Sequence, residues 1–146
     1  MNYTFSIPDQ AEPFTNLYML ALALYREARG EIYVAKVAVG WVIRNRVERN
    51  GWFGKGYFEV ITKRYQFSSF NLGEPNSVVF GPPNDSAWSD SIKAAVDVIQ
   101  SNVADPTGSA TFYHDKSLDA NPPSWASEYT HTADVGNFHF FKQAAA

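Results

Sequence analysis

The chain has 146 residues, no cysteine, and 12 basic against 15 acidic side chains, which give a formal net charge of −3. We expect one domain over residues 1–146, with residues 1–13 as an extended lead-in. The lack of cysteine in the sequence excludes disulfides and thiolate metal sites. Nucleic acid is not an expected partner, because the densest basic stretch, Arg44 to Arg49, is short and is interpreted as a solvated helix face.

The N-terminal sequence gives no indication of export or membrane insertion. It lacks the basic segment and the apolar run that a secretory signal needs. The apolar stretch from Leu17 to Leu24 is shorter than the roughly 20 residues that cross a bilayer. We therefore expect a protein that stays in the cytoplasm where it is made until another protein releases it.

The first predicted helix runs from about Thr15 to Gly30. Thr15 or Asn16 is the candidate N-cap, and Gly30 is expected to end the helix in a left-handed turn. The middle of this segment is apolar on nearly every side, which favours a helix packed on several faces.

The second predicted helix runs from about Val34 to Arg49, and Asn50 with Gly51 ends it. Apolar residues recur at helical spacing and form its inward stripe. Asn45 falls on the same stripe, and we interpret it as a buried amide that hydrogen-bonds to the backbone. The stripe consists of Val34, Val37, Ala38, Trp41 and Val42.

Residues 52–84 are rich in Gly, Pro, Asn and Ser, with one short helix predicted near residues 58–63. A loop-rich stretch of this length is typical of a functional segment or a mobile flap. A third main helix then begins at Asp85 or Ser86 and stops at the turn of residues 105–108.

The last third of the chain changes to the period of strands. Residues 110–114 and 138–141 are predicted strands, separated by an excursion that carries proline and serine. Helices followed by strands predict an α+β domain, helical over its first two-thirds, with a small antiparallel sheet near the C-terminus.

Glu27 is the strongest candidate for catalysis. On a helical wheel it lies at the edge of the apolar stripe of the first helix, close to the C-terminus of that helix. Partial burial and the negative end of the helix dipole both raise the pKa of a carboxyl group. A carboxyl that keeps its proton in this way can act as a general acid.

Other interpretations of the charged residues stay open at this point. The wheel alone favours an ion pair between Glu27 and Arg26, Arg29 or Arg64. Glu31 is better placed to stabilise the N-terminus of the second helix by its charge than to catalyse a reaction.

Metal and nucleophile chemistry is predicted only weakly. The three histidines show no standard ligand spacing. His114 and His139 lie on the two predicted strands and could meet, but zinc would need a third ligand such as His131 or Asp115. The sequence contains neither a Gly-x-Ser-x-Gly elbow nor a phosphate-binding loop. We therefore expect no metal and no other cofactor.

Several short segments together resemble the motifs of the spore-cortex-lytic type of cell wall hydrolase. No single segment is specific, but they occur in the family's order over residues 17–142. They are residues 27–31 (Glu-Ala-Arg-Gly-Glu), 37–40 and 45–47, then 66–68 (Gln-Phe-Ser), 105–108 with 110–113, Trp125, and 135–137 with 139–141.

This resemblance implies a lysozyme-like α+β domain that acts as a lytic transglycosylase on the glycan strand of peptidoglycan. It implies that Glu27 is the catalytic acid, which reverses the preference for a simple ion pair. The residues expected to bind substrate are Glu31, Gln66, Ser68, Phe70, Tyr113, Trp125 and His139.

The sequence departs from the family's pattern at two positions, Ser109 in place of a glycine and Phe70 in place of a tryptophan, and neither removes a catalytic group. A compact chain of this kind resembles a monomeric phage endolysin that a separate pore protein releases to the cell wall. The alternatives are a muramidase that hydrolyses the same bond, a zinc-dependent N-acetylmuramoyl-L-alanine amidase, and a wall-binding or virion module without activity.

Overall fold

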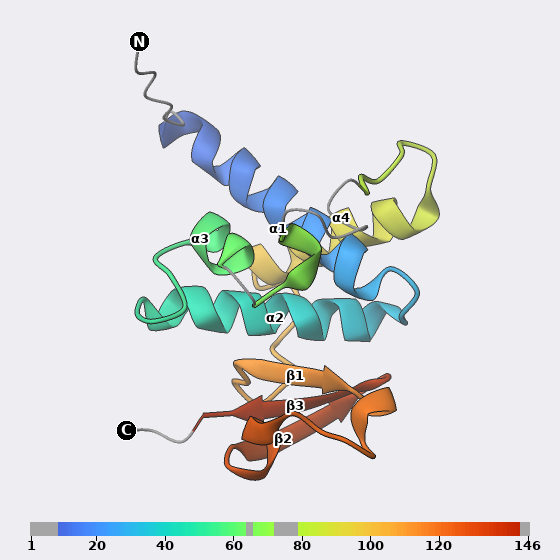
Figure 1. The fold of residues 1–146 in the computed structure, drawn as a ribbon. Helices are drawn as coiled ribbons and strands as arrows, with labels where there is room; N and C mark the ends of the chain where they lie inside the picture. The colour runs from blue at the N-terminus through green and yellow to red at the C-terminus, as the bar shows by residue number, and fades with distance from the viewer. Residues whose placement is uncertain (1–8, 64–65, 72–78, 144–146) are drawn as a thin grey trace.

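A computed structural model describes residues 9–63, 66–71 and 79–143 of the chain. Helices α1 to α4 form one part of the molecule and a three-stranded antiparallel sheet forms the other, with α2 between the remaining helices and the sheet (Figure 1). The predicted α+β class, with helices before strands, is therefore confirmed. Among the described helices, none has the length and apolar character needed to span a membrane.

Helix α1 (Glu12–Ala28) begins earlier than predicted, and a short 3-10 helix, η1 (Asp9–Ala11), precedes it. Pro13 lies in its first turn, where a missing N–H costs nothing. Thr15 lies inside the helix, so its prediction as the N-cap is wrong, and no side chain caps this end. The predicted extended lead-in is wrong from Asp9 onward, while residues 1–8 lie outside the described ranges.

A buried lysine closes the C-terminal end of α1. Lys36 is only 2% exposed, and its ammonium group donates to the backbone carbonyls of Ala28, Arg29 and Glu31 at 2.8, 2.9 and 2.8 Å. Carbonyls at a helix end have no partner within the helix, and a cation compensates both their hydrogen bonds and the helix dipole. This lysine therefore fixes the corner at which the chain leaves α1.

Helix α2 (Tyr33–Arg49) agrees with its prediction and ends at Asn50, which has the left-handed conformation with φ 47°. The left-handed turn predicted at Gly30 is wrong, since Gly30 is not among the glycines with positive φ. Asn45 is half-buried and donates to the Ala110 carbonyl at 2.9 Å, which confirms its predicted backbone bond. Val34 is 42% exposed, so its placement on the inward stripe is wrong.

The helices pack around α2, which is buried along most of its length. Helix α1 packs against α4 (Ser86–Ile99) and α2, while the short α3 (Tyr57–Thr62) packs against both α1 and α2. Asp85 caps α4 as predicted, because its carboxylate accepts the Ala87 N–H at 2.9 Å. The core is apolar and continuous with the inner face of the sheet.

The sheet has the order β1-β3-β2 and is antiparallel throughout. Strands β1 (Phe112–Asp115) and β3 (Phe138–Lys142) correspond to the two predicted strands, whereas β2 (Thr130–Val135) was not predicted. The turn between β2 and β3 contains Gly136 with φ 56°, and a Cβ atom there would lie 3.0 Å from that of Ala35 on α2. Glycine thus lets the hairpin approach the helical part closely.

We predict that Lys36→Met lowers the free energy of unfolding by about 1–3 kcal/mol, the cost of leaving a buried acceptor without a donor. Urea unfolding followed by circular dichroism measures this loss. The exposed Lys55 provides the matched control, because Lys55→Met removes the same charge from the surface and should change stability by less than about 0.5 kcal/mol. Equal effects of the two substitutions would contradict the role given to Lys36.

Candidate active site

A cleft of about 670 Å³ opens between the helical part and the edge strand β1. Its volume is within the range of sites that enclose a ligand. Helices α1 and α2 supply its floor, and β1 with the segment that follows it supplies the opposite wall. The lining residues are Glu27, Arg46, Trp52, Gln66, Phe67, Phe112, Tyr113, His114, Leu118, Pro123, Trp125, Tyr129 and Gln143.

Glu27 is the only carboxyl among the described residues that line the cleft. It lies one residue before the end of α1, inside the corner that Lys36 closes. Its carboxylate accepts a long hydrogen bond of 3.4 Å from the hydroxyl of Tyr113 on β1. No ion pair joins Glu27 to another described residue, and Arg64, one of its predicted partners, lies outside the described ranges.

The surroundings of Glu27 favour its protonated form. Burial raises the pKa of this carboxyl, and the hydrogen bond from Tyr113 acts in the opposite direction. The buried Ser69 hydroxyl also lowers the pKa of Glu27, although its geometry is not that of a standard hydrogen bond. Burial has the largest effect on this pKa, and the Ser69 contact has the smallest. The result is a carboxylic acid held ready to donate a proton.

Arg46 places a buried positive charge at the base of the cleft. Its guanidinium is packed between aromatic rings, with the ring of Phe53 4.8 Å and that of Phe112 5.0 Å away. Its Nε donates to the Thr111 carbonyl at 2.7 Å, and its Nη1 donates to the Gln66 side-chain carbonyl at 3.3 Å. Burial lowers the pKa of Arg46 to about 10, so it stays charged at neutral pH. The interpretation of this arginine as part of a solvated face is therefore wrong.

Aromatic side chains form the outer wall of the cleft. The rings of Trp125 and Tyr129 are stacked, with centroids 5.6 Å apart and planes at 21°, and both line the cleft. Trp52 lies at the rim and is 65% exposed. Flat apolar faces beside polar groups are the surface that sugar rings pack against.

The structure brings Glu27 together with three of the predicted substrate-binding residues, Gln66, Tyr113 and Trp125. The side chain of a fourth, Ser68, lies outside what the structure describes. The other three are not among the residues that line the cleft. They are Glu31, Phe70 and His139.

These three residues have other contacts. The Glu31 carboxylate accepts a 3.0 Å hydrogen bond from the Asn137 amide, which ties the corner between the first two helices to the turn before β3. Phe70 is half-buried, and the guanidinium of Arg26 lies 4.5 Å from the centre of its ring. The ring of His139, on β3, lies between the carboxylates of Asp119 and Asp134.

The aspartates of the last third all have partners outside the cleft. Asp115 accepts the Ser117 N–H at 2.8 Å and caps the short 3-10 helix η4 (Lys116–Leu118). Asp119 and Asp134 bind the two ring nitrogens of His139. The described part of the chain therefore provides no second carboxyl opposite Glu27.

Several cleft residues were not predicted as site residues. Arg46 follows Val42 by four residues, so its helical spacing already placed it on the buried stripe of α2. His114 was considered only as a metal ligand, yet it lines the cleft. Trp52 and Tyr129 carry no local signal, because only the tertiary fold brings them to the cleft.

A buried carboxylic acid with a raised pKa is the group with which enzymes protonate the leaving oxygen of a glycosidic bond. The model of the Cell Wall Hydrolase family matches residues 30–141. The chain therefore belongs to the Cell Wall Hydrolase family. Glu27 lies just before the matched range, so its place in the site depends on the geometry described above.

Curated relatives and solved structures agree with this family. A spore cortex-lytic enzyme of Bacillus cereus is 36% identical over 98 residues, which are 67% of this chain and 34% of the relative. A spore cortex-lytic enzyme of Halalkalibacterium halodurans is 34% identical over 98 residues, 67% of this chain and 26% of the relative. The chain thus spans about a third or less of the length of these relatives.

Among solved structures, the catalytic domain of the germination-specific lytic transglycosylase SleB from Bacillus anthracis is similar, with a TM-score of 0.69 and 26% identity. The match covers 96% of this chain and 100% of that domain. The catalytic domain of SleB from Bacillus cereus has a TM-score of 0.66 and 28% identity, covering 88% of this chain and 91% of that one.

We predict that Glu27→Gln makes the protein more stable at pH 7. Burial raises the folded-state pKa of Glu27 above its unfolded value of about 4.3. The stability that this group contributes is therefore complete below the unfolded pKa and is lost as the pH rises through the folded pKa. Glutamine resembles the protonated form of Glu27 at every pH. The free energies of unfolding of Glu27→Gln and of the parent protein should therefore become equal near pH 3.5. Urea unfolding at both pH values measures the difference.

The exposed Glu128 is the control for this measurement, because Glu128→Gln removes the same charge from the surface. A Glu27→Gln variant that is less stable than the parent at pH 7 would contradict the burial of this carboxyl.

Proposed function

We propose that this protein cleaves the glycan strand of peptidoglycan as a lytic transglycosylase, with Glu27 as both acid and base. The strongest support is the carboxyl group of Glu27, because it is the only carboxyl among the described residues that line the cleft and because burial raises its pKa. The similarity to SleB catalytic domains over nearly the whole chain supports the same activity.

The reaction proceeds in two proton transfers at one carboxyl. Glu27 first donates its proton to the oxygen that bridges the muramic sugar to the next sugar, and the bond between C1 and that oxygen breaks. The carbonyl oxygen of the muramic N-acetyl group stabilises the positive charge at C1. The Glu27 carboxylate then removes the proton from the 6-hydroxyl of the same sugar, whose oxygen bonds to C1 and closes the anhydro ring. Glu27 recovers its proton in this second step.

This chemistry requires only one protein carboxyl. Hydrolases generally use two, about 5–5.5 Å apart in retaining enzymes and about 6.5–9.5 Å apart in inverting ones. The described residues provide no partner of that kind for Glu27, since Asp115, Asp119 and Asp134 are engaged elsewhere. A muramidase mechanism is therefore the less supported alternative.

The remaining cleft residues orient the sugars. The Gln66 amide, which Arg46 holds by its carbonyl oxygen, can donate its N–H groups to an acetamido oxygen of the substrate. Tyr113 fixes the direction of the Glu27 carboxyl, and the stacked rings of Trp125 and Tyr129 offer a face to a pyranose.

The direct test compares the activities of variants at Glu27 and Glu31, the two glutamates near the corner between α1 and α2. Glu27→Gln should keep the fold and lower the rate of wall lysis by about 10²- to 10⁴-fold, the usual contribution of general acid catalysis. Glu31→Gln should retain most of the activity with a modest loss of stability, because its carboxylate binds Asn137 and does not line the cleft. The turbidity of purified cell walls measures the rate, and circular dichroism verifies the fold. A well-folded Glu31→Gln without activity beside an active Glu27→Gln would reverse the assignment.

Tyr113 should set the pH range of activity. Its hydrogen bond lowers the pKa of Glu27, so Tyr113→Phe raises that pKa. Because the acid must be protonated, activity falls as the pH rises through this pKa, and the alkaline limb of the pH–rate profile should move to higher pH. Tyr129→Phe, in the same cleft, should leave the limb in place. An unmoved limb in Tyr113→Phe would refute this contact.

The zinc-dependent amidase differs in its product, since it would release new amino termini of alanine. His114 is the only histidine among the described residues that line the cleft. Digests in which amino termini appear at the rate of wall lysis, and in which Glu27→Gln stays active, would favour the amidase. The wall-binding module without activity predicts no lysis by the wild-type protein.

That this protein is a monomeric phage endolysin, and that a separate pore protein releases it to the cell wall, are predictions. Expression inside a bacterium should leave the cells intact, and co-expression of a pore-forming protein should lyse them. Lysis without the pore protein would show that the chain reaches the wall by another route.

A further inference from the structure

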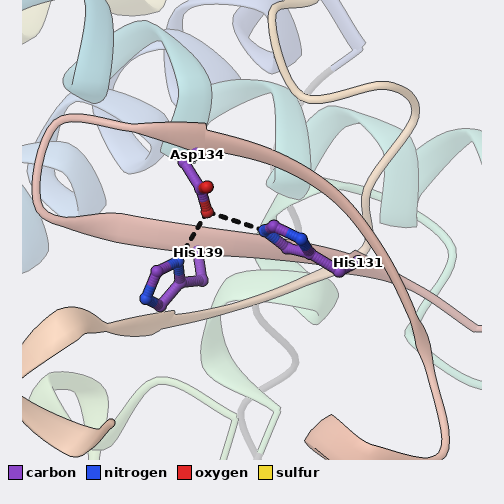
Figure 2. A group of neighbouring side chains, drawn as sticks. All are labelled: His131, Asp134 and His139. Atoms are coloured by element: carbon purple, nitrogen blue, oxygen red, sulfur yellow. Dashed lines mark hydrogen bonds and ion pairs between the residues drawn. The ribbon is translucent and has the colours of Figure 1, made fainter.

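Two histidines and an aspartate come together on one face of the β2–β3 hairpin, and none of the three is among the residues that line the cleft. Figure 2 shows the Asp134 carboxylate between the imidazole rings of His131 and His139. Asp134 and His139 are directly opposite each other in the register of the two strands. Their side chains therefore lie on one face of the sheet.

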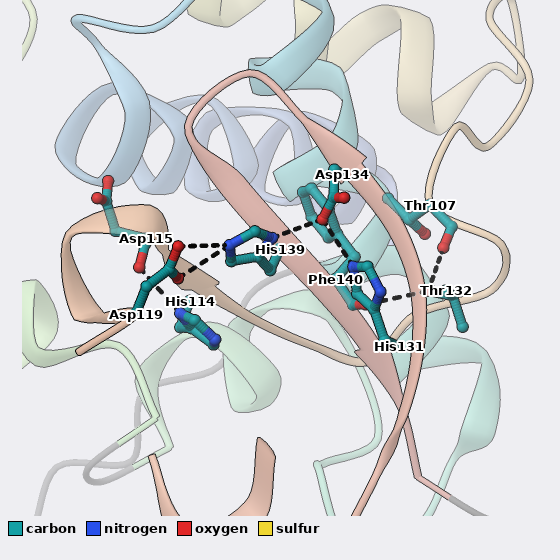
Figure 3. Close-up of polar contacts among 9 residues, drawn as sticks. All are labelled: Thr107, His114, Asp115, Asp119, His131, Thr132, Asp134, His139 and Phe140. Atoms are coloured by element: carbon teal, nitrogen blue, oxygen red, sulfur yellow. Dashed lines mark hydrogen bonds and ion pairs between the residues drawn. The ribbon is translucent and has the colours of Figure 1, made fainter. Parts of the chain in front are cut away.

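A bulge in β2 brings His131 to the same face. His131 and Asp134 are three residues apart and would point to opposite faces of a regular strand. The register shifts between His131 and Ala133, so that Thr132 is the extra residue of a bulge. Because of this extra residue, the side chains of His131 and Asp134 lie on the same face. The Thr132 hydroxyl donates to the Thr107 carbonyl at 2.5 Å, which anchors the bulge to the loop before β1 (Figure 3). The fold thus holds the three side chains together.

Hydrogen bonds join the three side chains at distances that a bound ion would lengthen. Asp134 Oδ1 lies 2.6 Å from Nε2 of His131 and 2.5 Å from Nδ1 of His139, and one atom from each residue lies within 4.8 Å of the others. Zinc bonds of about 2.0 Å at tetrahedral angles place neighbouring ligand atoms about 3.3 Å apart. Side-chain shifts of less than about 1 Å would therefore admit an ion.

Asp119 provides the outer partner that a ligating histidine usually has. Its carboxylate lies 2.9 Å from Nε2 of His139, on the side of the ring away from Asp134 (Figure 3). With an ion bound, a neutral His139 would donate its one N–H from Nε2 to Asp119. Nδ1 would then direct its lone pair to the ion, in place of its hydrogen bond with Asp134. A carboxylate that fixes the tautomer and orientation in this way is the common second shell of metal-bound histidine.

The donor set indicates the class of ion. Two imidazole nitrogens and a carboxylate suit Zn²⁺ and its neighbours in the first transition row, whereas Ca²⁺ and Mg²⁺ prefer all-oxygen sites. The side chains of His131 and Asp134 are 49% and 48% exposed, so an ion can enter without opening the fold.

We propose that His131, Asp134 and His139 bind one first-row divalent metal ion, such as Zn²⁺, which fastens β2 to β3. Asp119 holds the ring of His139 and so connects the site to the segment after η4. The site is separate from the cleft, and the proposal does not depend on the glycan-strand chemistry.

Calorimetric titration of the untagged, chelator-treated protein with Zn²⁺ tests the proposal. The wild-type protein should bind one ion per chain, and His131→Gln and Asp134→Asn should abolish this binding. Asp119→Asn should weaken it by about 10- to 100-fold, the usual effect of losing an outer-shell partner. Replacing Zn²⁺ by Co²⁺ should give visible absorption bands in the wild-type protein and none in His131→Gln.

Two matched controls separate this site from its surroundings and from the active site. His114→Gln removes the remaining histidine, whose ring lies 5.2 Å from that of His139, and should leave binding unchanged. Glu27→Gln should bind the ion like the wild-type protein even where wall lysis is lost. No saturable binding by the wild-type protein, or equal binding by well-folded His131→Gln, would overturn the proposal.

Discussion

The ammonium group of Lys36 binds the three carbonyls around the end of α1, and the position of the catalytic candidate depends on this contact. Glu27 lies one residue before the end of that helix. A frayed helix end would let the carboxyl turn toward water, where its pKa would return toward the ordinary value. The closed corner instead directs it into the cleft, and Glu31 and Asn137 tie the same corner to the β2–β3 turn. Lys36, the end of α1 and the β2–β3 hairpin thus together determine the position of the Glu27 side chain.

The cleft combines groups that are far apart in the sequence. Tyr113 contacts Glu27 across a separation of 86 residues. Arg46 connects α2, on the floor of the cleft, to the start of the strand that carries Tyr113, because it donates to the Thr111 carbonyl. Arg46 is enclosed by aromatic rings and not by carboxylates, so its charge is available to the cleft without bringing a second acid near Glu27. Among the described residues, the cleft therefore combines one carboxyl with one buried cation, which is the physical basis for a mechanism with one acid.

Local patterns were sufficient to predict α2, the Asp85 cap, the edge strand β1 and the central strand β3, because each depends on short-range spacing or turn chemistry. Glu27 was singled out as the catalytic candidate from its place on the wheel together with the family motif, and the structure places it in the cleft. Strand β2 was missed because a bulge at Thr132 interrupts its alternation. The burial of Arg46 and the contacts of Glu31 and His139 could not be predicted from charge alone, since they depend on how the hairpin docks on α2.

The most direct test of a mechanism with one carboxyl is the fate of water in the reaction. Purified peptidoglycan would be digested by the wild-type protein in oxygen-18-labelled water, and the muropeptides analysed by mass spectrometry. A mechanism with one carboxyl predicts products that end in 1,6-anhydro-muramic acid and carry no label, because the sugar's own 6-hydroxyl attacks C1. Reducing ends that carry the label at C1 would contradict it, and would show that water is the nucleophile and that a second group activates it.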